Sequence, residues 1–349
     1  MSYTYDALYR LTVAQAGATA TPTWKLGFTY DRYANRTAQT VLAGTGVPSN
    51  TVTINPAANR ITDPGYSYDA NGNMTTDGVN ALVYDAENRM VSSSGSTYGY
   101  DGNSLRVVKT SGGTTTVYVF DRQKVIAEYV NGVLGEEYIY LGKDLLAAYA
   151  GATLIYYHRD HLSVRTITDG TSGTVVGQQA HYPYAETWYA TGTTTDYRFT
   201  SYKRDAESGN DYAVFRYDVN RLGRFASPDP IAGSFAVPQS LNRYGYVAGD
   251  PVNRIDPAGL RGFDDFFPPP FGFCSPFPFR VTLLIDGLEV PPFLICPRSL
   301  MRAFSWGPFA TVICSCFGQN VIPFGTIVKE CVFRCSFRRF NCVRQQDIQ

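Results

Sequence analysis

The fold is decided by three stretches that share one layout: YDANGNMTTDG (68–78), YDAENRMVSS (84–93) and YDGNSLRVVKT (100–110). Their Tyr-Asp heads follow one another at intervals of 16 residues. A fixed repeat with turn residues at its centre is typical of stacked supersecondary units. Asn, Asp and Gly tolerate the left-handed backbone of tight turns, and the flanking Tyr, Val and Met alternate as in strands. Each stretch therefore predicts a strand, a tight turn and a second strand.

The same pattern extends along the chain in both directions. Tyr-Asp pairs also occur at Tyr5-Asp6 and Tyr30-Asp31, and strand-like runs separated by Asn-Gly and Leu-Gly-Lys continue from Thr115. The 26 Tyr residues favour strands, because aromatic and β-branched side chains fit a pleated surface. We expect an all-β fold of antiparallel hairpins, in which the one helix signal before residue 260 is short and covers 238–244.

Bulk composition excludes several classes of protein. The net charge is zero, so no global attraction to nucleic acid is evident. No apolar run reaches the ~18 residues that a membrane helix needs. The opening MSYTYDALYRLT has neither a basic nor an apolar region, so no secretory signal is visible.

Composition changes sharply after Leu260. All seven Cys lie beyond this residue, and RGFDDFFPPPFGFC follows it directly. Consecutive prolines cannot continue a sheet interior. We therefore predict a repeat sheet at 1–150, a second β domain at 151–260, a Pro/Phe-rich linker at 261–280 and a variable segment at 281–349.

The stretch SPDPIAGSFAVPQSLNRYGYVAGDPVNRIDPAGL (227–260) holds two Asp-Pro motifs, headed by Asp229 and Asp256. Two carboxylates held about 3 Å apart share one proton. The charged member can then activate water while the protonated member polarises a carbonyl. The other reading is structural, because Asp-Pro followed by Gly is also an ordinary turn.

Three motifs in this order resemble the Rhs/YD-repeat family. They are the Tyr-Asp repeats, the block YYHRDHLSVRTITD (156–169), and RYDVNRLGRFASPDPIAG with its continuation to Leu260. The resemblance covers essentially residues 1–260. It implies a β-sheet strip that spirals into a hollow shell, is closed at one end by the core domain at 151–260, and is followed by a variable effector.

The resemblance also implies self-cleavage. In family members with an active core, the two Asp-Pro aspartates cut the chain after Asp-Pro-x-Gly-Leu, which here predicts Asp229 and Asp256 as the pair and Leu260–Arg261 as the bond. Arg224, together with Arg221, is the candidate for orienting the chain or holding one carboxylate ionised. The 27 residues from Asp229 to Asp256 exceed the family's usual interval, and we expect a loop near Phe235–Pro238 to absorb the excess.

Other candidate sites have plainer interpretations. His158 and His161 lie three apart, on opposite faces of a regular strand, so a structural role is favoured over a metal site for them and for His181. No phosphate-binding loop is present, and we predict neither a cofactor nor a metal. The cysteines of the tail could form disulfides after export, bind zinc through sulfur, or be inert. The tail's five basic residues between Lys329 and Arg344 leave nucleic-acid binding open.

The function predicted from the sequence is a shell fragment of a polymorphic-toxin or toxin-complex-like system, secreted or at the cell surface. Its partners would be its own C-terminal segment as enclosed cargo and a second shell-forming protein or secretion apparatus. The alternative is a non-enzymatic adhesion module whose Tyr-rich sheet binds carbohydrate. A third reading is an inert remnant of a larger gene.

Overall fold

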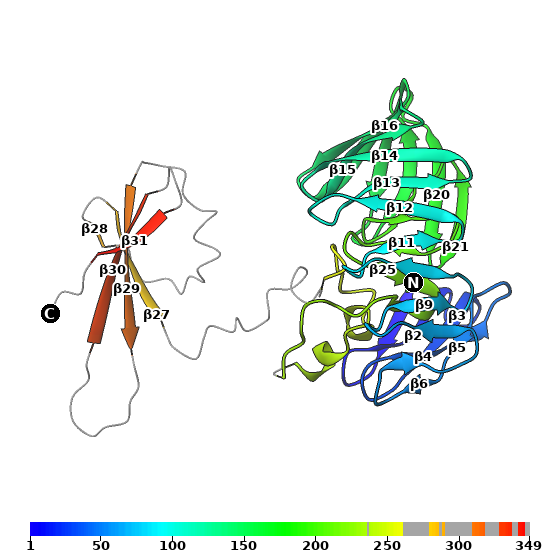
Figure 1. Cartoon of the computed structure of the whole chain (residues 1–349), viewed down its shortest axis with the longest axis horizontal. Helices are drawn as coiled ribbons and strands as arrows, with labels where there is room; N and C mark the ends of the chain where they lie inside the picture. The colour runs from blue at the N-terminus through cyan, green and yellow to red at the C-terminus, as the bar shows by residue number, and fades with distance from the viewer. Residues whose placement is uncertain are drawn as a thin grey trace. The chain divides into compact units, whose positions relative to one another are not determined.

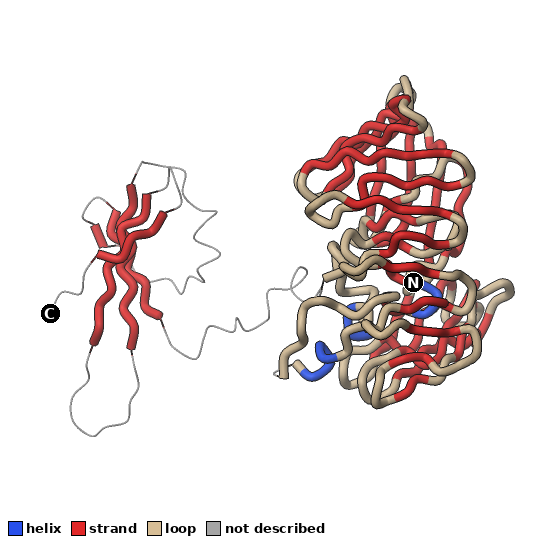
Figure 2. The backbone as a smooth tube through the Cα atoms, viewed as in Figure 1, coloured by secondary structure: helices blue, strands red, loops and turns tan. Residues whose placement is uncertain are grey.

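The structure is a computed structural model that describes residues 1–235 and 237–260, together with the backbone of five strands beyond them. The chain divides into two compact units, Met1–Phe266 and Phe267–Gln349. Strands dominate both units in the part of the chain that is described (Figure 1; Figure 2). The prediction of an all-β fold is confirmed.

The first unit starts with a five-stranded sheet and two small hairpins. In each of them every strand pairs antiparallel with its neighbour in sequence. The strands are β1 (Ser2–Tyr5), β2 (Leu11–Gly17), β3 (Pro22–Tyr30), β4 (Arg36–Ala43) and β5 (Asn50–Thr51), followed by the pairs β6 (Ile54–Asn55) with β7 (Arg60–Ile61) and β8 (Tyr66–Tyr68) with β9 (Met74–Asp77).

A twelve-stranded antiparallel meander follows, and its strands stack one above another (Figure 1). It continues without a break across residue 150. The strands are β10 (Leu82–Tyr84), β11 (Met90–Ser93), β12 (Ser96–Tyr100), β13 (Arg106–Ser111), β14 (Thr114–Asp121), β15 (Lys124–Val130), β16 (Val133–Leu141), β17 (Asp144–Ala150), β18 (Thr153–Arg159), β19 (Val164–Asp169), β20 (Val175–His181) and β21 (Thr187–Gly192).

The unit ends with a compact five-stranded sheet and three short 3-10 helices. The sheet contains β22 (Tyr197–Phe199), β23 (Tyr202–Arg204), β24 (Asp211–Tyr212), β25 (Tyr217–Val219) and β26 (Arg224–Phe225). The helices are η1 (Asn220–Leu222), η2 (Pro238–Leu241) and η3 (Val247–Gly249). The helix predicted at 238–244 is thus present as η2, which is shorter than expected.

The Tyr-Asp heads have a local physical explanation. Tyr ends a strand at an irregularity in register, and the following Asp accepts backbone N–H groups of the turn through Oδ1; Asp85, for example, binds Glu87 N at 2.9 Å and Arg89 N at 3.0 Å. The third residue after Asp is always left-handed: Tyr9, Ala34, Gly72, Asn88 and Ser104. The predicted hairpin with a left-handed turn residue is confirmed, and Asp is the residue that closes it.

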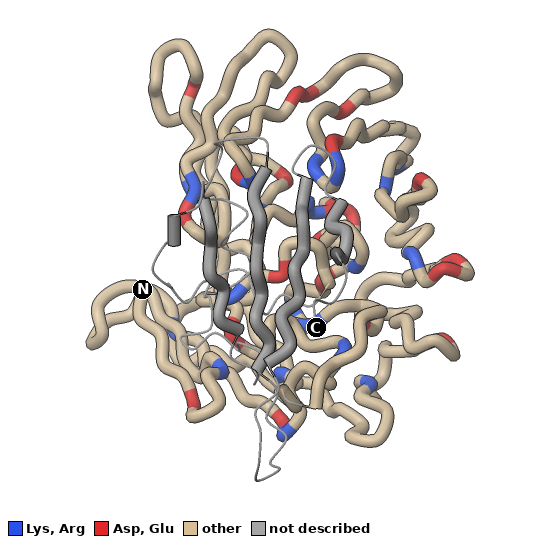
Figure 3. Tube along the Cα trace, turned by 90° about the vertical axis from the view of Figure 1, so that its left-hand side faces the viewer, with Lys and Arg blue, Asp and Glu red and all other residues tan. Residues whose placement is uncertain are grey.

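Three clusters of buried side chains form the core of the first unit. Each of them includes an aromatic residue from the sheet of strands β22 to β26, namely Phe225, Tyr217 or Tyr197. These rings pack against residues of the repeat hairpins. The last quarter of this unit therefore packs against hairpins from all along the repeat region. Acidic and basic residues are interspersed along the described part of the chain (Figure 3).

The second unit contains an antiparallel sheet in the order β28-β27-β29-β30-β31. Its strands are β27 (Phe279–Ile285), β28 (Leu288–Glu289), β29 (Phe309–Phe317), β30 (Val328–Ser336) and β31 (Asn341–Gln345). The alternatives for the cysteines and for the basic residues concern side chains outside the described residues, and they stay predictions. The boundary of the predicted linker at residue 280 also stays a prediction.

Candidate functional site

The two predicted aspartates lie beside each other in space. Asp229 follows β26 and Asp256 heads the turn that ends at Leu260, and both are buried, at 6% and 2% exposure. One nitrogen atom joins them: Nη2 of Arg216 donates to Oδ2 of Asp229 at 2.9 Å and to Oδ2 of Asp256 at 3.2 Å. The fold thus brings two carboxylates, 27 residues apart in sequence, to one guanidinium group.

Arg216 is held by contacts on several sides. Its Nη1 donates to the backbone oxygen of Arg243 at 3.0 Å, and its Nε donates to the backbone oxygen of Gly259. The guanidinium carbon lies 3.6 Å from the centre of the Phe225 ring. This planar group with several donors can serve two carboxylates and two carbonyls at once, which the single ammonium of lysine cannot do with the same geometry.

A hairpin explains why Arg216 and Asp229 meet although they are 13 residues apart. Arg216 precedes β25 and Asp229 follows β26, and these strands pair antiparallel around Gly223, the left-handed residue after η1. The ends of an antiparallel hairpin return to the same place. Sequence analysis missed Arg216; its position just before the hairpin strand was the signal that could have found it.

The Asp256 turn holds the chain just before the predicted cleavage site. Leu260 N donates to Oδ1 of Asp256 at 2.8 Å, and Gly259 N donates to the backbone oxygen of Asp256 at 3.2 Å. Gly259 has a φ of 67°, and an added Cβ would lie 2.7 Å from the oxygen of Ala213. Glycine is therefore required here both by the left-handed backbone and by the close approach of another chain segment.

Asp229 is fixed in a similar way. Its Oδ1 accepts the N–H of Ile231 at 2.8 Å, which is the capping contact expected of an Asp-Pro turn. Its backbone pairs with Arg243, whose oxygen accepts Asp229 N at 2.8 Å. The structural reading of both Asp-Pro motifs as turns is thus correct, and the same carboxylates also form the pair, because each uses one oxygen for its turn and the other for Arg216.

A small cavity of about 20 Å³ adjoins the pair, and its lining includes Arg216, Asp229 and Asp256. A space of this size holds about one water molecule. Burial lowers the pKa of Arg216 below its usual value, while the two carboxylates oppose that shift. A buried cation between two acids stabilises a negative charge on the pair.

The other predicted residues lie elsewhere. Arg224 points away from the pair: its Nη2 donates to the backbone oxygen of Asn59 at 2.8 Å, and its guanidinium stacks 4.6 Å from the Tyr244 ring. Arg221 forms an ion pair with Asp77 at 2.5 Å. Leu260 is beside the pair as predicted, whereas Arg261 lies outside the described residues. The side chain of Phe235, where the loop insertion is expected, is 90% exposed, and the insertion itself stays a prediction.

The three histidines take part in local hydrogen bonds. His158 Nε2 lies 2.9 Å from the hydroxyl of Thr168, and His161 Nε2 lies 2.8 Å from the oxygen of Val252. His181 is buried between the oxygen of Tyr182 and the hydroxyl of Ser163, and burial lowers its pKa to about 3. Among the described residues, no group of three or more His, Cys, Asp or Glu side chains is placed to hold a metal ion.

The chain is similar to curated bacterial nucleases. It is 31% identical over 253 residues to the tRNA3(Ser)-specific nuclease WapA of Bacillus spizizenii, and 30% identical over 253 residues to the tRNA nuclease WapA of Bacillus subtilis. Each match covers 66% of this chain and 11% of the relative. The chain therefore spans about a tenth of the length of these relatives. A comparison with protein-family models gives no match.

Solved structures share the fold. A TcdB2-TccC3-Cdc42 crystal structure matches 74% of this chain and 15% of its own, with a TM-score of 0.59 and 21% identity. A Photorhabdus luminescens Tc holotoxin pore matches 76% of this chain and 15% of its own, with a TM-score of 0.59 and 19% identity. No helix in the described part of the chain is long and apolar enough to span a membrane.

Fold and site together define a class of protein: a strip of antiparallel hairpins headed by Tyr-Asp and filled at one end by a domain that carries a buried carboxylate pair. The chain belongs to the Rhs/YD-repeat family, as the matches to WapA show, and it shares its fold with the toxin-complex structures.

Proposed function

We propose that this chain is a shell fragment of a polymorphic-toxin or toxin-complex-like system, and that it cuts itself after Leu260 with Asp229 and Asp256. One observation carries the proposal: Arg216 binds both carboxylates and the oxygen of Gly259, while Asp256 binds the N–H of Leu260. The backbone on the N-terminal side of the bond is thus anchored to the acid pair itself.

The chemistry would be hydrolysis by a carboxylate pair. One ionised carboxylate takes a proton from water, and the resulting hydroxide adds to the carbonyl carbon of Leu260. The protonated partner donates to the carbonyl oxygen, and the C–N bond then breaks as a proton passes to the nitrogen of Arg261. The products are a carboxyl group on Leu260 and a free amine on Arg261, with one water consumed.

The residues of the site would have distinct tasks. Asp229 and Asp256 act as base and acid, and the adjoining cavity gives room for about one water. The positive charge of Arg216 stabilises the negative charge of the buried carboxylate. Anchoring of the Gly259 oxygen and the Leu260 N–H fixes the bond relative to the acids, which lowers the entropic part of the barrier.

The released segment would be the effector, and the first unit would be part of its enclosure. This role fits the relatives, which are named as nucleases, and the structural neighbours, which are toxin complexes. We propose that a second shell-forming protein or a secretion apparatus acts together with it. We also propose secretion or display at the cell surface.

Mass spectrometry of the purified full chain tests the cleavage. We expect two fragments, ending at Leu260 and starting at Arg261, and an intact chain in Asp229→Asn and Asp256→Asn. Asp250→Asn is the matched control, because Asp250 is also buried and bound to a nearby Asn side chain but does not contact Arg216. An intact wild-type chain after prolonged incubation, or cutting that persists in both variants, would refute the proposal.

The alternative is a module that binds carbohydrate without enzymatic activity. It is favoured by aromatic rings that remain partly exposed on strands β15, β17 and β18 of the long sheet, namely Tyr129, Tyr149 and Tyr156. If it holds, the intact chain should show a thermal shift with sugars that is lost in Tyr149→Ala, while Asp229→Asn has no effect on it.

A further inference from the structure

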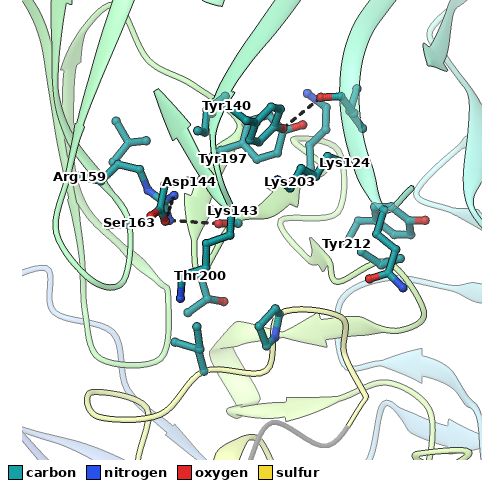
Figure 4. A pocket seen from close by; sticks show the side chains of 18 of the residues that line it. Lys124, Tyr140, Lys143, Asp144, Arg159, Ser163, Tyr197, Thr200, Lys203 and Tyr212 are labelled. Atoms are coloured by element: carbon teal, nitrogen blue, oxygen red, sulfur yellow. Dashed lines mark hydrogen bonds and ion pairs between the residues drawn. The ribbon is translucent and has the colours of Figure 1, made fainter. Parts of the chain in front are cut away.

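A second and larger cavity, of about 220 Å³, lies in the first unit next to the Asp256 turn (Figure 4). Ile255 and Pro257, the two neighbours of Asp256 in sequence, are part of its lining. The opposite walls come from the long sheet, through β14, β16 and the turn after β16. This cavity is separate from the water-sized one, because the two share no lining residue.

Aromatic rings form much of the wall. They come from two different sheets and are Tyr118, Phe120, Tyr140, Tyr197 and Tyr212, of which Tyr140, Tyr197 and Tyr212 are labelled in Figure 4. A dry cavity of about 150 Å³ lined by apolar side chains can bind benzene. The cavity described here is large enough for one phenyl ring, and edge-to-face contacts with its tyrosines would favour one.

The charges around the cavity are unequal. Five basic side chains line it, against the single acid Asp144. Three of the basic groups are already in ion pairs: Arg106 with Asp205 at 2.5 Å, Lys203 with Glu128 at 2.7 Å and Arg159 with Asp144 at 3.0 Å. The remaining two, Lys124 and Lys143, form no ion pair with any residue that the structure describes. The cavity therefore suits a ligand that combines an aromatic ring with carboxylates.

The sequence that follows Leu260 has this composition. Arg261–Phe267 reads RGFDDFF, with two adjacent Asp residues between Phe residues. Phe266 lies nine positions after Pro257, which is in the cavity wall, and a chain of that length reaches up to about 30 Å when extended. Both the chemistry and the length of the chain are compatible with binding in cis.

We propose that the cavity lined by Tyr140, Tyr212 and Lys143 binds the Phe-Asp-Asp-Phe stretch that begins the C-terminal segment. One Phe ring would enter among the tyrosines, and the Asp carboxylates would meet Lys124 and Lys143. The biological role of this binding rests on the proposed function: after the chain is cut, the shell would still bind the first residues of the released segment.

Photo-crosslinking in the full chain tests this binding. With Phe266→p-benzoylphenylalanine, irradiation should join residue 266 to peptides from 114–145, identified by mass spectrometry. Phe235→p-benzoylphenylalanine is the control, because Phe235 is 90% exposed and is not part of the cavity lining. Crosslinks from residue 266 only to other regions, only to a second molecule, or no more abundant than those from residue 235, would overturn the proposal.

Charge reversal supplies the second test. Lys143→Glu should lower the crosslink yield about two- to fivefold, the range expected for a partly exposed ion pair. Arg122→Glu is matched to it, because Arg122 lies in the neighbouring hairpin turn and does not line the cavity. Adding Asp264→Lys to Lys143→Glu should restore the yield. Equal loss in both single variants, or no rescue, would contradict the assignment.

The same experiment distinguishes this inference from the proposed function. Crosslinking is measured in the wild-type background and in Asp229→Asn, which is expected to stay uncut. Crosslinks in both backgrounds with no cleavage in either would refute self-processing and leave the binding intact. Cleavage without crosslinks to 114–145 would refute the binding alone.

Discussion

Leu260 donates its backbone N–H to Oδ1 of Asp256 over 2.8 Å. The acid proposed to help break the bond after Leu260 therefore also positions the residue that precedes it. The second oxygen of Asp256 faces Arg216 and, through it, Asp229. The same residues form the turn and the site, so we expect substitutions in the turn to reduce the rate of cleavage more than they reduce the stability of the fold.

Gly259→Ala should slow self-cleavage strongly. The left-handed backbone costs a residue with Cβ about 1–2 kcal/mol, and the new Cβ would lie 2.7 Å from the oxygen of Ala213. We expect the half-time of cleavage, followed by gel densitometry, to rise at least about tenfold, which corresponds to about 1.4 kcal/mol.

Gly142→Ala isolates the contribution of the contact. Gly142 has a similar φ of 61°, but nothing lies within 4 Å of an added Cβ. The Gly142→Ala variant should therefore have the energetic cost of a left-handed backbone without a steric clash, and we expect its cleavage rate to equal that of the wild type. If Gly259→Ala cuts at the wild-type rate, the observed turn is not the reactive conformation.

Arg216→Lys should reduce cleavage more than Arg224→Lys. Lysine keeps the charge but cannot reach both carboxylates and the oxygens of Gly259 and Arg243 together. Hydrogen bonds to charged groups contribute about 1.5–3 kcal/mol each, so we expect a loss of at least about tenfold in rate. Arg224→Lys should change the melting temperature but not the cleavage rate measured below it. Equal rate losses would favour Arg224 as a member of the site.

Local features of the fold could be read from the sequence, because the residues that cause them are adjacent. Asp after Tyr closes its own turn, and the residue three positions later is left-handed in each of the five repeats. The identity of the carboxylate pair could be inferred from a motif for the same reason, since each Asp caps an Asp-Pro turn.

The partner of the pair could not be inferred in this way. Arg224 was predicted because it lies near Asp229 in sequence, but neighbouring residues of a strand point to opposite faces. Phe225 faces Arg216, at 3.6 Å from ring centre to guanidinium carbon, so Arg224 faces Tyr244 instead. The register of the hairpin β25–β26 decides which basic side chain reaches the two carboxylates. This register cannot be predicted from the spacing of the residues along the chain.

Removing Arg106 should destabilise the first unit by about 1.5–3 kcal/mol, because the buried carboxylate of Asp205 would lose one charged hydrogen-bond donor and keep only Lys109 as an ionic partner. Arg106→Met is the variant, and urea denaturation followed by the fluorescence of Trp24 and Trp188 is the measurement. The double variant Arg106→Met with Asp205→Leu removes both charges and should recover much of the loss. A double variant no more stable than the single one would show that the lost ion pair itself, rather than the weaker pairing of Asp205 that remains, sets the cost.

Asp218→Asn should stabilise the protein at neutral pH. Asp218 is 1% exposed, and burial, followed by the neighbouring Asp211, raises its pKa well above the usual value. An acid whose pKa is raised by folding favours the folded state most at pH values below about 3.9, and that advantage is lost as pH rises toward the folded-state pKa. Asn resembles the protonated acid and has no proton to lose, so the variant should gain about 1–3 kcal/mol at pH 7 and nothing at pH 3.

Asp211→Asn is the matched control, because Asp211 pairs with Asp218 across β24 and β25 but accepts two hydrogen bonds from Arg204, at 2.9 and 2.7 Å. It should therefore destabilise the fold at pH 7, the opposite sign to Asp218→Asn in an almost identical position. Urea denaturation of both variants from pH 3 to pH 8 measures the difference. If Asp218→Asn loses as much stability at pH 7 as Asp211→Asn, then Asp218 is ionised and paired in the folded protein. Replacement by an amide costs that much stability only where the carboxylate it replaces is charged.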